Sequence, residues 1–334
     1  MSDFDEDEVL KADSETEYEE QESEVGHDEE GIPEDDQIEP CPLNQDIVAK
    51  CLSLLCHTGN SLSHAYVRLD LNSKGLTDLV LLSSFIHLRY LDISSNHLSD
   101  LSPLAGLTHL LWVKGDSNRI QQFESQWFDQ LGFLQWLSLA SNRLCDVKGL
   151  KATALETLNL IGNGIQTMHG LECNNLTNLV TLELRGNCLE TTDGICLPNL
   201  RHLHLVWLAK NNIKRLEGLE RLEQLNTLHL RDNQLESLDG INSSMKCLQY
   251  LNIRGNLISS QSALQALFTV EKSLRVLVVL DNPLAKTDDY RLYLISHLSQ
   301  LERLDKDPVT ADEKSEALEK LKEFEDESAQ DQED

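Results

Sequence analysis

Histidine and cysteine side chains are the residues of this chain from which a metal site could be built. His202 and His204 stand two apart, as on one face of a strand, and His229 follows in the next stretch of similar sequence. Neighbouring strands bring side chains to about 5 Å, close enough for shared coordination. No carboxylate or thiolate stands clearly beside these residues, and an equally weak group consists of Cys51, Cys56, His57 and His64. We therefore expect no metal, and interpret the histidines as surface residues.

Motifs for enzymatic catalysis are absent from the sequence. It holds no Walker loop, no H-E-x-x-H and no nucleophile elbow. Gly162-Asn163-Gly164 is a turn within a repeat and not the start of a dinucleotide-binding loop. The sequence therefore predicts a protein that has no catalytic residues, needs no cofactor and takes no small-molecule substrate.

A phrase of the form L-x-x-L-x-L-x-x-N-x-L recurs ten times, at steps of 21 to 26 residues. The copies begin at Tyr66, Leu88, Leu110, Leu134, Leu155, Leu179, Leu200 or Leu203, Leu225, Leu248 and Leu274. A period of about 20 to 29 residues with this pattern is typical of leucine-rich repeats. The fold class that it predicts is an α/β solenoid with about ten parallel strands on its concave face. The leucines of each copy are buried only when copies stack into one core.

The asparagine of the phrase is the polar residue that this core must accommodate. It falls at Asn96, Asn118, Asn142, Asn163, Asn187, Asn211, Asn233, Asn256 and Asn282, while Lys74 replaces it in the first copy. We expect its amide to bond backbone groups of adjacent turns, and the loss of such a buried bond costs roughly 1 to 3 kcal/mol. Near the end of the array, at Asn282, we expect a smaller loss than at Asn142 or Asn187.

The convex face and the two ends follow from the spacing of other apolar residues. Apolar residues recur at threes in two sets, which are Leu98, Leu101, Leu104, Leu107 and Ile213, Leu216, Leu219, Leu222. This spacing favours short 3₁₀ turns over long α-helices on the convex face. Residues 43–56 predict a helical N-terminal cap with Asn44 as N-cap residue. Residues 282–308 resemble the C-terminal cap of intracellular leucine-rich repeat proteins.

Both ends of the chain are strongly acidic, whereas the array is nearly neutral. Residues 1–40 carry a net charge of −18 and residues 305–334 a net charge of −9, out of −29 for the chain. We expect residues 1–40 to be a disordered tail, 41–308 the repeat domain with its caps, and 309–334 an acidic and partly helical tail. Thr310 and Glu313 predict a capping box for a solvated helix through about Phe324.

The cellular compartment is predicted from targeting and membrane-spanning features that the sequence lacks. Acidic residues follow Met1, no apolar run reaches the ~18 residues of a membrane span, and the eight cysteines do not cluster as in extracellular caps. We therefore expect a protein of the cytoplasm that does not contact membranes.

Variable positions of the repeats describe a candidate binding surface on the concave face. The third position holds Tyr90, Trp112 and Trp136 in successive copies, which predicts an outward aromatic column. Aromatic anchors dominate the energetics of many protein interfaces. The seventh position holds Arg185, Arg231 and Arg254, a stripe able to bind carboxylates or phosphates. The column could instead pack on itself, and Glu183 or the acidic tails could neutralise the stripe.

The repeat that contains Asn211 has two possible registers. A copy that begins at Leu200 exposes His202 and His204, whereas a copy that begins at Leu203 exposes Leu205 and Trp207, because the strand period is two. The sequence is compatible with both.

Three stretches resemble a family of axonemal leucine-rich repeat proteins, namely residues 52–69, 87–112 and 228–240, together with the acidic N-terminal tail. The likeness extends over residues 41–308 and is weakest at Val206-Trp207-Leu208. It implies a cytoskeletal component of the radial spoke in motile cilia and sperm flagella, with spoke-head proteins as partners. No binding to nucleic acid is expected. The alternative is a nuclear leucine-rich protein that uses its acidic tails as a histone chaperone or phosphatase regulator.

Deletion of residues 1–40 tests the boundary of the folded domain. Because this segment lacks the apolar residues needed to offset ordering entropy, its removal should change the melting temperature by no more than about a degree. Thermal unfolding followed by circular dichroism measures this, and a large drop would mean that the segment packs on the array.

Overall fold

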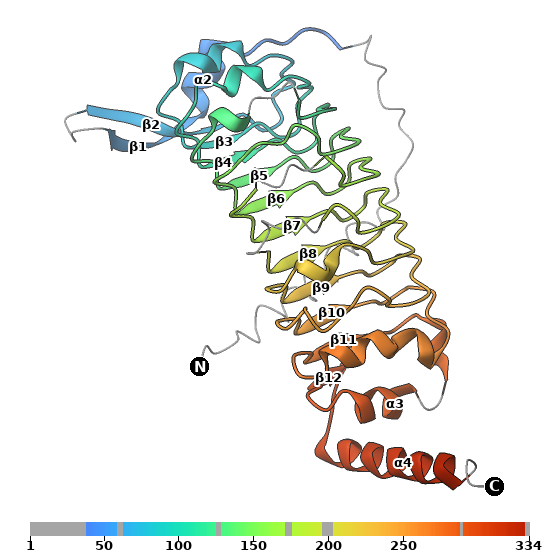
Figure 1. The fold of residues 1–334 in the computed structure, drawn as a ribbon. Helices are drawn as coiled ribbons and strands as arrows, with labels where there is room; N and C mark the ends of the chain where they lie inside the picture. The colour runs from blue at the N-terminus through green and yellow to red at the C-terminus, as the bar shows by residue number, and fades with distance from the viewer. Residues whose placement is uncertain are drawn as a thin grey trace. The chain divides into compact units, whose positions relative to one another are not determined.

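Residues 38–58, 63–124, 128–170, 176–195, 203–287 and 290–330 are described by a computed structural model, with side chains as far as Leu321. Residues Cys41–Asp334 form one compact unit. A single sheet of thirteen strands runs through it, and the strands follow one another in sequence order. Figure 1 shows them stacked along the array like rungs. The prediction of a leucine-rich repeat solenoid is confirmed.

Eleven of these strands, β2 to β12, are parallel to one another. They are β2 (Ser63–Asp70), β3 (Tyr90–Asp92), β4 (Trp112–Lys114), β5 (Trp136–Ser138), β6 (Thr157–Asn159), β7 (Thr181–Glu183), β8 (Leu205–Trp207), β9 (Thr227–His229), β10 (Tyr250–Asn252), β11 (Val276–Val278) and β12 (Arg303–Leu304). An antiparallel strand closes each end, β1 (Leu52–Thr58) beside β2 and β13 (Asp307–Pro308) beside β12.

Each of the strands β2 to β11 is followed by a turn in which one residue adopts a left-handed conformation, directly before the asparagine or, in the first copy, before Lys74. Its φ lies between 52° and 67° at Ser73, Ser95, Ser117, Ser141, Gly162, Gly186, Lys210, Asp232, Gly255 and Asp281. Glycine accepts this conformation without steric cost, and short polar residues tolerate it better than branched ones. The sequence therefore favours small or polar residues directly before the asparagine.

The asparagine bonds the backbone of two neighbouring turns, as expected. At Asn187 the side-chain oxygen accepts from the Ile165 N–H at 3.1 Å. Its amide nitrogen donates to the carbonyl oxygens of Leu160 and Leu184, each at 2.9 Å. At Asn282 the side-chain oxygen likewise accepts from the Ile258 N–H, and the amide nitrogen donates to the carbonyl oxygens of Ile253 and Val279. Each asparagine thus ties its own repeat to the preceding one.

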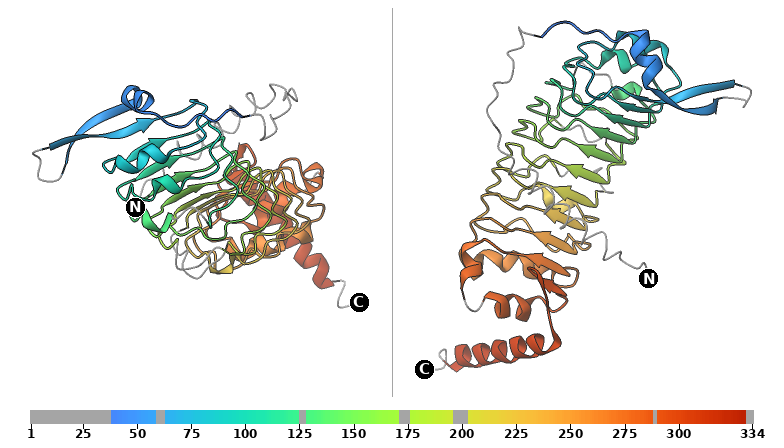
Figure 2. Two further views of the ribbon diagram at one scale, coloured as in Figure 1. Left: turned by 90° about the horizontal axis from the view of Figure 1, so that it is seen from above. Right: turned by 180° about the vertical axis from the view of Figure 1, so that it is seen from behind.

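Leucines fill the interior between the sheet and the opposite face. Leu98, Leu101, Leu104 and Leu107 are all at most 1% exposed. In the described part of the array, the helices between the strands are 3₁₀ helices, namely η2 (Val80–Ser84), η3 (Ser102–Leu104), η4 (Phe128–Gln130), η5 (Leu219–Arg221), η6 (Gln261–Val270) and η7 (Pro283–Lys286). The expected preference for 3₁₀ turns on this face is confirmed. Figure 2 shows the stacked strands of the array from above and from behind.

The repeat that contains Asn211 adopts the register that begins at Leu203. Leu203, Val206 and Leu208 are buried, and Leu205 and Trp207 lie on the outer face of β8. His202 lies outside the described residues. His229 pairs with Trp207 across the sheet, not with His204, and is only 4% exposed. The expectation that His229 is a surface residue is therefore wrong, because neighbouring rings cover it.

The N-terminal cap differs from its prediction. Asn44 is the N-cap residue of helix α2 (Gln45–Cys51), and its side chain accepts from the Ile47 N–H at 3.0 Å. The helix does not continue to Cys56, because Leu52–Thr58 forms β1 and pairs with β2. Backbone pairing with an adjacent strand here prevails over the helical spacing of the apolar residues.

The C-terminal cap consists of α3 (Tyr290–His297), the β12–β13 hairpin and α4 (Ala311–Gln330). Thr310 and Glu313 form the expected capping box, with Glu313 N–H donating to the Thr310 hydroxyl and Thr310 N–H to the Glu313 carboxylate. Arg291 of α3 bonds Glu313 at 2.8 Å and lowers the pKa of that carboxyl to about 2. Ala317 is 1% exposed. The first turns of α4 therefore pack on the cap and are not a solvated helix.

Substitution of single asparagines tests how the stack is stabilised. Asn282 makes the same bonds as Asn187 and is fully buried. We therefore expect its substitution to cost as much stability as that of Asn187, which revises the smaller loss expected from the sequence. Asn187→Ala and Asn282→Ala should each lower the free energy of unfolding by roughly 1 to 3 kcal/mol. Asn212→Ala is the matched control, because Asn212 is exposed and directly follows Asn211, one of the repeated asparagines. Urea unfolding measures all three, and a change at Asn212 as large as at Asn187 would contradict this account.

Candidate protein-binding surface

The outer face of the sheet carries the aromatic column that the sequence predicts. Tyr90, Trp112 and Trp136 are direct partners on β3, β4 and β5. Leu91, Val113 and Leu137 alternate with them and point into the core, where each is fully buried. The period of two in a strand therefore separates the residues that hold the fold from those that face outward.

The two tryptophans of the column stack on each other. Their ring centroids are 4.6 Å apart and the ring planes differ by 11°. Stacking covers part of each ring, so both side chains are half-buried, whereas Tyr90 beside them is 37% exposed. The column is therefore partly packed on itself and still presents ring surface, fixed in position by its neighbours. Rings that are already ordered lose little entropy when a partner binds.

Polar groups border the column at the ends of the strands. Asp116 accepts the Ser138 hydroxyl at 2.5 Å and the Ala140 N–H at 2.9 Å, and it lies 3.7 Å from the Lys114 ammonium. The carboxylate thus bridges two repeats beside the stacked rings. An apolar centre with a polar margin is the arrangement found in protein interfaces.

The arginine stripe lies further along the sheet and is engaged in ion pairs. Arg231 Nε is 3.2 Å from Asp232, and Arg254 Nε is 2.6 Å from Asp281. Both acids belong to the turns after the strands. Arg185 follows β7, two strands beyond Trp136 on β5, a distance of roughly 10 Å at 4.8 Å per strand. The structure thus places the stripe and the column on one sheet but does not bring them together.

A second aromatic cluster on the same face was missed by the sequence analysis. The rings of Trp207 and His229 stack with centroids 3.7 Å apart, and the Tyr250 ring lies 4.8 Å from His229. Burial lowers the pKa of His229 from 6.5 to about 3, because an imidazolium would lose its hydration there. The pattern becomes visible once the repeat that contains Asn211 is started at Leu203, since Trp207 and His229 then share the fifth position of their copies.

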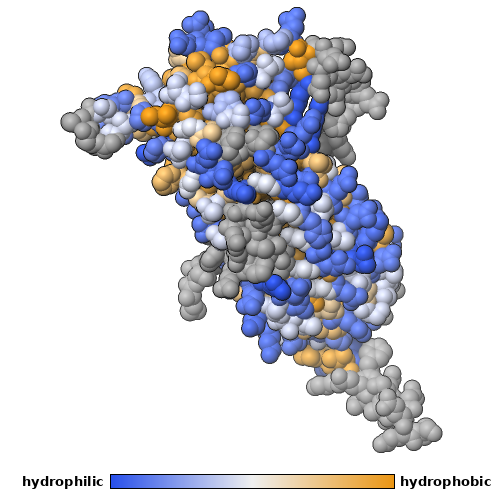
Figure 3. All heavy atoms as spheres, turned by 45° about the horizontal axis from the view of Figure 1, so that its top comes forward, coloured by the Kyte–Doolittle hydropathy of each residue, from blue (hydrophilic) through white to orange (hydrophobic). Residues whose placement is uncertain are grey.

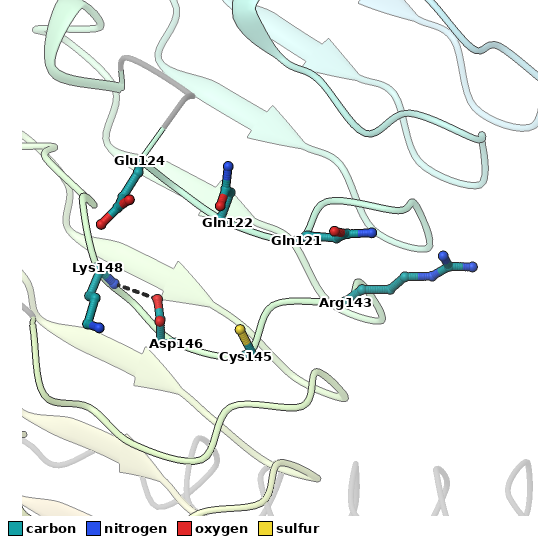
Figure 4. Close-up of a pocket in the computed structure, with 7 residues that line it drawn as sticks. All are labelled: Gln121, Gln122, Glu124, Arg143, Cys145, Asp146 and Lys148. Atoms are coloured by element: carbon teal, nitrogen blue, oxygen red, sulfur yellow. Dashed lines mark hydrogen bonds between the residues drawn. The ribbon is translucent and has the colours of Figure 1, made fainter. Parts of the chain in front are cut away.

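A polar hollow of about 350 Å³ lies between two repeats, in the segments that lead away from the strands. Figure 4 shows its lining side chains, which are Gln121, Gln122, Glu124, Arg143, Cys145, Asp146 and Lys148. The Asp146 carboxylate accepts the backbone N–H of Lys148 at 3.0 Å. The lining residues include no histidine, the base that most often activates a thiol.

Metal-binding groups are spread apart in the described ranges of the chain. No group of three or more His, Cys, Asp or Glu residues gathers there with the geometry of a metal site. His57 and His64 face each other in the β1–β2 hairpin, with ring centroids 4.1 Å apart, but lack further ligands of these types. None of the helices in the described ranges combines the length and apolarity that crossing a bilayer requires.

The buried His229 makes stability depend on pH in a definite direction. Its pKa is about 3 in the folded chain and about 6.5 when unfolded, so the unfolded state binds the extra proton between these values. Stability contributed by neutral His229 is therefore present above pH 6.5 and is lost as the pH falls. His229→Phe keeps a ring in the stack and should reduce the loss between about pH 7.5 and 5.5 by roughly 1 kcal/mol. Urea unfolding at both pH values measures it, and identical pH dependence would contradict burial of this ring.

Comparisons with known proteins agree with the repeat architecture. Family models of leucine-rich repeats match residues 86–144 and 170–332. Leucine-rich repeat-containing protein 23 of Homo sapiens is 47% identical over 278 residues, which are 83% of this chain and 79% of the relative. Its counterpart in Xenopus tropicalis is 48% identical over 86% of this chain and 81% of the relative.

Solved structures support the fold alone. A leucine-rich repeat protein of Leptospira interrogans matches with a TM-score of 0.53 at 23% identity, over 72% of each chain. Leucine-rich repeat-containing protein 23 of four vertebrates, in contrast, matches 83 to 94% of this chain at 44 to 48% identity. The resemblance noted in the sequence is thereby confirmed, and the chain belongs to the leucine-rich repeat-containing protein 23 family.

Proposed function

We propose that this protein is a non-enzymatic scaffold of the axonemal radial spoke, needed for assembly of the spoke head and hence for the motility of cilia and sperm flagella. The observation that carries the binding role is the stacked Trp112–Trp136 pair with exposed Tyr90 on the strand face. A rigid solenoid that presents aromatic rings binds another protein without moving its backbone. The place in the radial spoke rests on the family resemblance of residues 41–308.

Spoke-head proteins are the partners that this proposal implies. The aromatic column supplies apolar contact area, and Asp116, Lys114 and the more distant arginines supply charged margins. Because Arg231 and Arg254 are already paired with Asp232 and Asp281, they contribute less to affinity than the rings. The rings are therefore the anchors of the proposed interface.

Removal of the stacked pair tests the proposal. Trp112→Ala combined with Trp136→Ala should abolish capture of spoke-head proteins from a flagellar extract. Each anchor is worth about 2 kcal/mol or more, so both together lower the affinity roughly several hundredfold. The leucine core is untouched, and circular dichroism and thermal melting check that the array remains folded.

Thr157→Ala combined with Thr181→Ala is the matched control, because these threonines occupy the same position on the next two strands. This variant should capture spoke-head proteins as the parent chain does. Unchanged capture by the folded tryptophan variant would refute the aromatic site. A tagged copy that enters the nucleus of ciliated cells and not the axoneme would refute the place in the radial spoke.

A further inference from the structure

The β1–β2 hairpin ends the sheet at its N-terminal side and extends beyond the array. Leu52 pairs with Leu69 at its base and Thr58 with Ser63 near its tip. Figures 1 and 2 show the hairpin projecting sideways from the stacked strands. β1 stands first in the strand order, so within the described ranges β2 is the neighbour that pairs with it. Its other edge points alternate N–H and C=O groups away from β2.

The two ends of the sheet differ in how this edge is protected. β13 is two residues long, contains Asp307 and Pro308, and precedes α4. A short strand with a charge and a proline is a common protection against pairing with other chains. β1 has seven residues, Leu-Ser-Leu-Leu-Cys-His-Thr, without proline, acid, lysine or arginine. Among the described residues, one end of the sheet is thus protected and the other leaves an edge at which a strand could pair.

Apolar side chains accompany this edge. Leu54, Leu55 and Tyr66 are 51%, 55% and 48% exposed. Leu55 and Tyr66 are direct partners across the hairpin and therefore lie on one face. This face also carries Arg68, the partner of Tyr90, so it continues the face of the aromatic column. Figure 3 shows hydrophobic surface on the projecting arm, next to its grey tip.

Leu54 adds backbone strain at the same place. Its φ is 57°, a left-handed conformation that costs a leucine on the order of 1 kcal/mol or more. The direct pairs of the ladder are Ser53 with Arg68 and Leu55 with Tyr66, and Leu54 between them has none. Because about half of the Leu54 side chain is exposed, it contributes less burial than a core leucine to offset this strain, which is consistent with a use in binding.

Charge identifies what kind of chain fits this edge. The whole chain carries a net charge of −29, so two copies repel each other. From Gln45 to Asp70, Lys50 and Arg68 balance Asp46 and Asp70. An uncharged edge on a strongly acidic protein favours a partner that is neutral or basic, rather than a second copy.

We propose that β1 binds an extended segment of another protein as an additional strand, in which apolar side chains alternate and acidic ones are absent. The added strand would bond to the open edge of β1 and place its apolar residues against Leu55 and Tyr66. Backbone bonds provide affinity in such β-strand addition, and side-chain contacts provide specificity. The bonding edge and its two side chains belong to β1 and β2, whereas the aromatic column belongs to β3, β4 and β5, so the inference can be tested independently of the proposed function.

A peptide library provides the probe. Eight-residue segments displayed on phage are selected on the full chain, and the selected peptide is synthesised with and without N-methyl groups on alternate amides. The unmethylated peptide should slow amide hydrogen exchange within Leu52–Thr58. Methylation on the bonding edge should weaken binding at least roughly tenfold, because it removes the donors needed for strand pairing.

Variants locate the site. Leu55→Lys combined with Tyr66→Lys should lower the affinity for the peptide roughly tenfold or more. Val80→Lys is the matched control, since Val80 is an exposed apolar residue outside the hairpin, on η2, and should leave binding unchanged. Trp112→Ala with Trp136→Ala should also leave it unchanged. The methylated peptide tests the unaltered chain, so the outcome does not depend on whether the lysine variant folds.

Three results would overturn the proposal. One is that no selected peptide slows exchange in β1. Another is that binding is lost with the tryptophan pair and is insensitive to methylation, which would place the peptide on the aromatic column. The last is protection of β1 without any peptide, together with a dimer in sedimentation, which would make a second copy the occupant.

Discussion

The bonds of the buried asparagine amides are the interaction on which the remainder of this structure depends. Each turn between strands leaves backbone N–H and C=O groups inside the array, where water does not reach them. Asn187 satisfies one donor and two acceptors from two repeats, and the same bonds recur as far as Asn282. An unsatisfied buried group costs roughly 1 to 3 kcal/mol, so leucine packing alone would leave the turns unstable.

This constraint fixes the rest of each repeat. The residue before the asparagine must adopt a left-handed conformation, which serine, glycine, aspartate and one lysine supply. The strand before it is therefore three residues long in most repeats, with its middle residue buried. The side chains on the outer face of these strands are not needed to fill the core. Aromatic residues occupy these positions in two clusters. Binding residues and core residues are thus separated within three consecutive positions of the chain.

The ends of the stack follow a different rule, because an end has a neighbour on one side only. At the C-terminal end α3, β13 and α4 cover the core, and Arg291 joins them through Glu313. Asp305 accepts the Val279 and Leu280 N–H groups in place of a further repeat. At the N-terminal end α2 buries Val48 on the core, while β1 continues outward beyond it. The N-terminal end therefore combines a cap with an exposed hairpin.

The sequence by itself determined the repeat, its asparagine bonds, the 3₁₀ turns and the outward column at Tyr90, Trp112 and Trp136, because these follow from residue spacing within one copy. Tertiary structure decided what depends on contacts between copies. The register of the repeat that contains β8 follows from pairing of β8 with β7 and β9, which buries Val206 and turns Trp207 outward. Stacking of Trp207 and His229 then buries a histidine that looks polar in sequence. Residues 52–58 became a strand instead of a helix because β2 offered them a pairing edge, which no local pattern records.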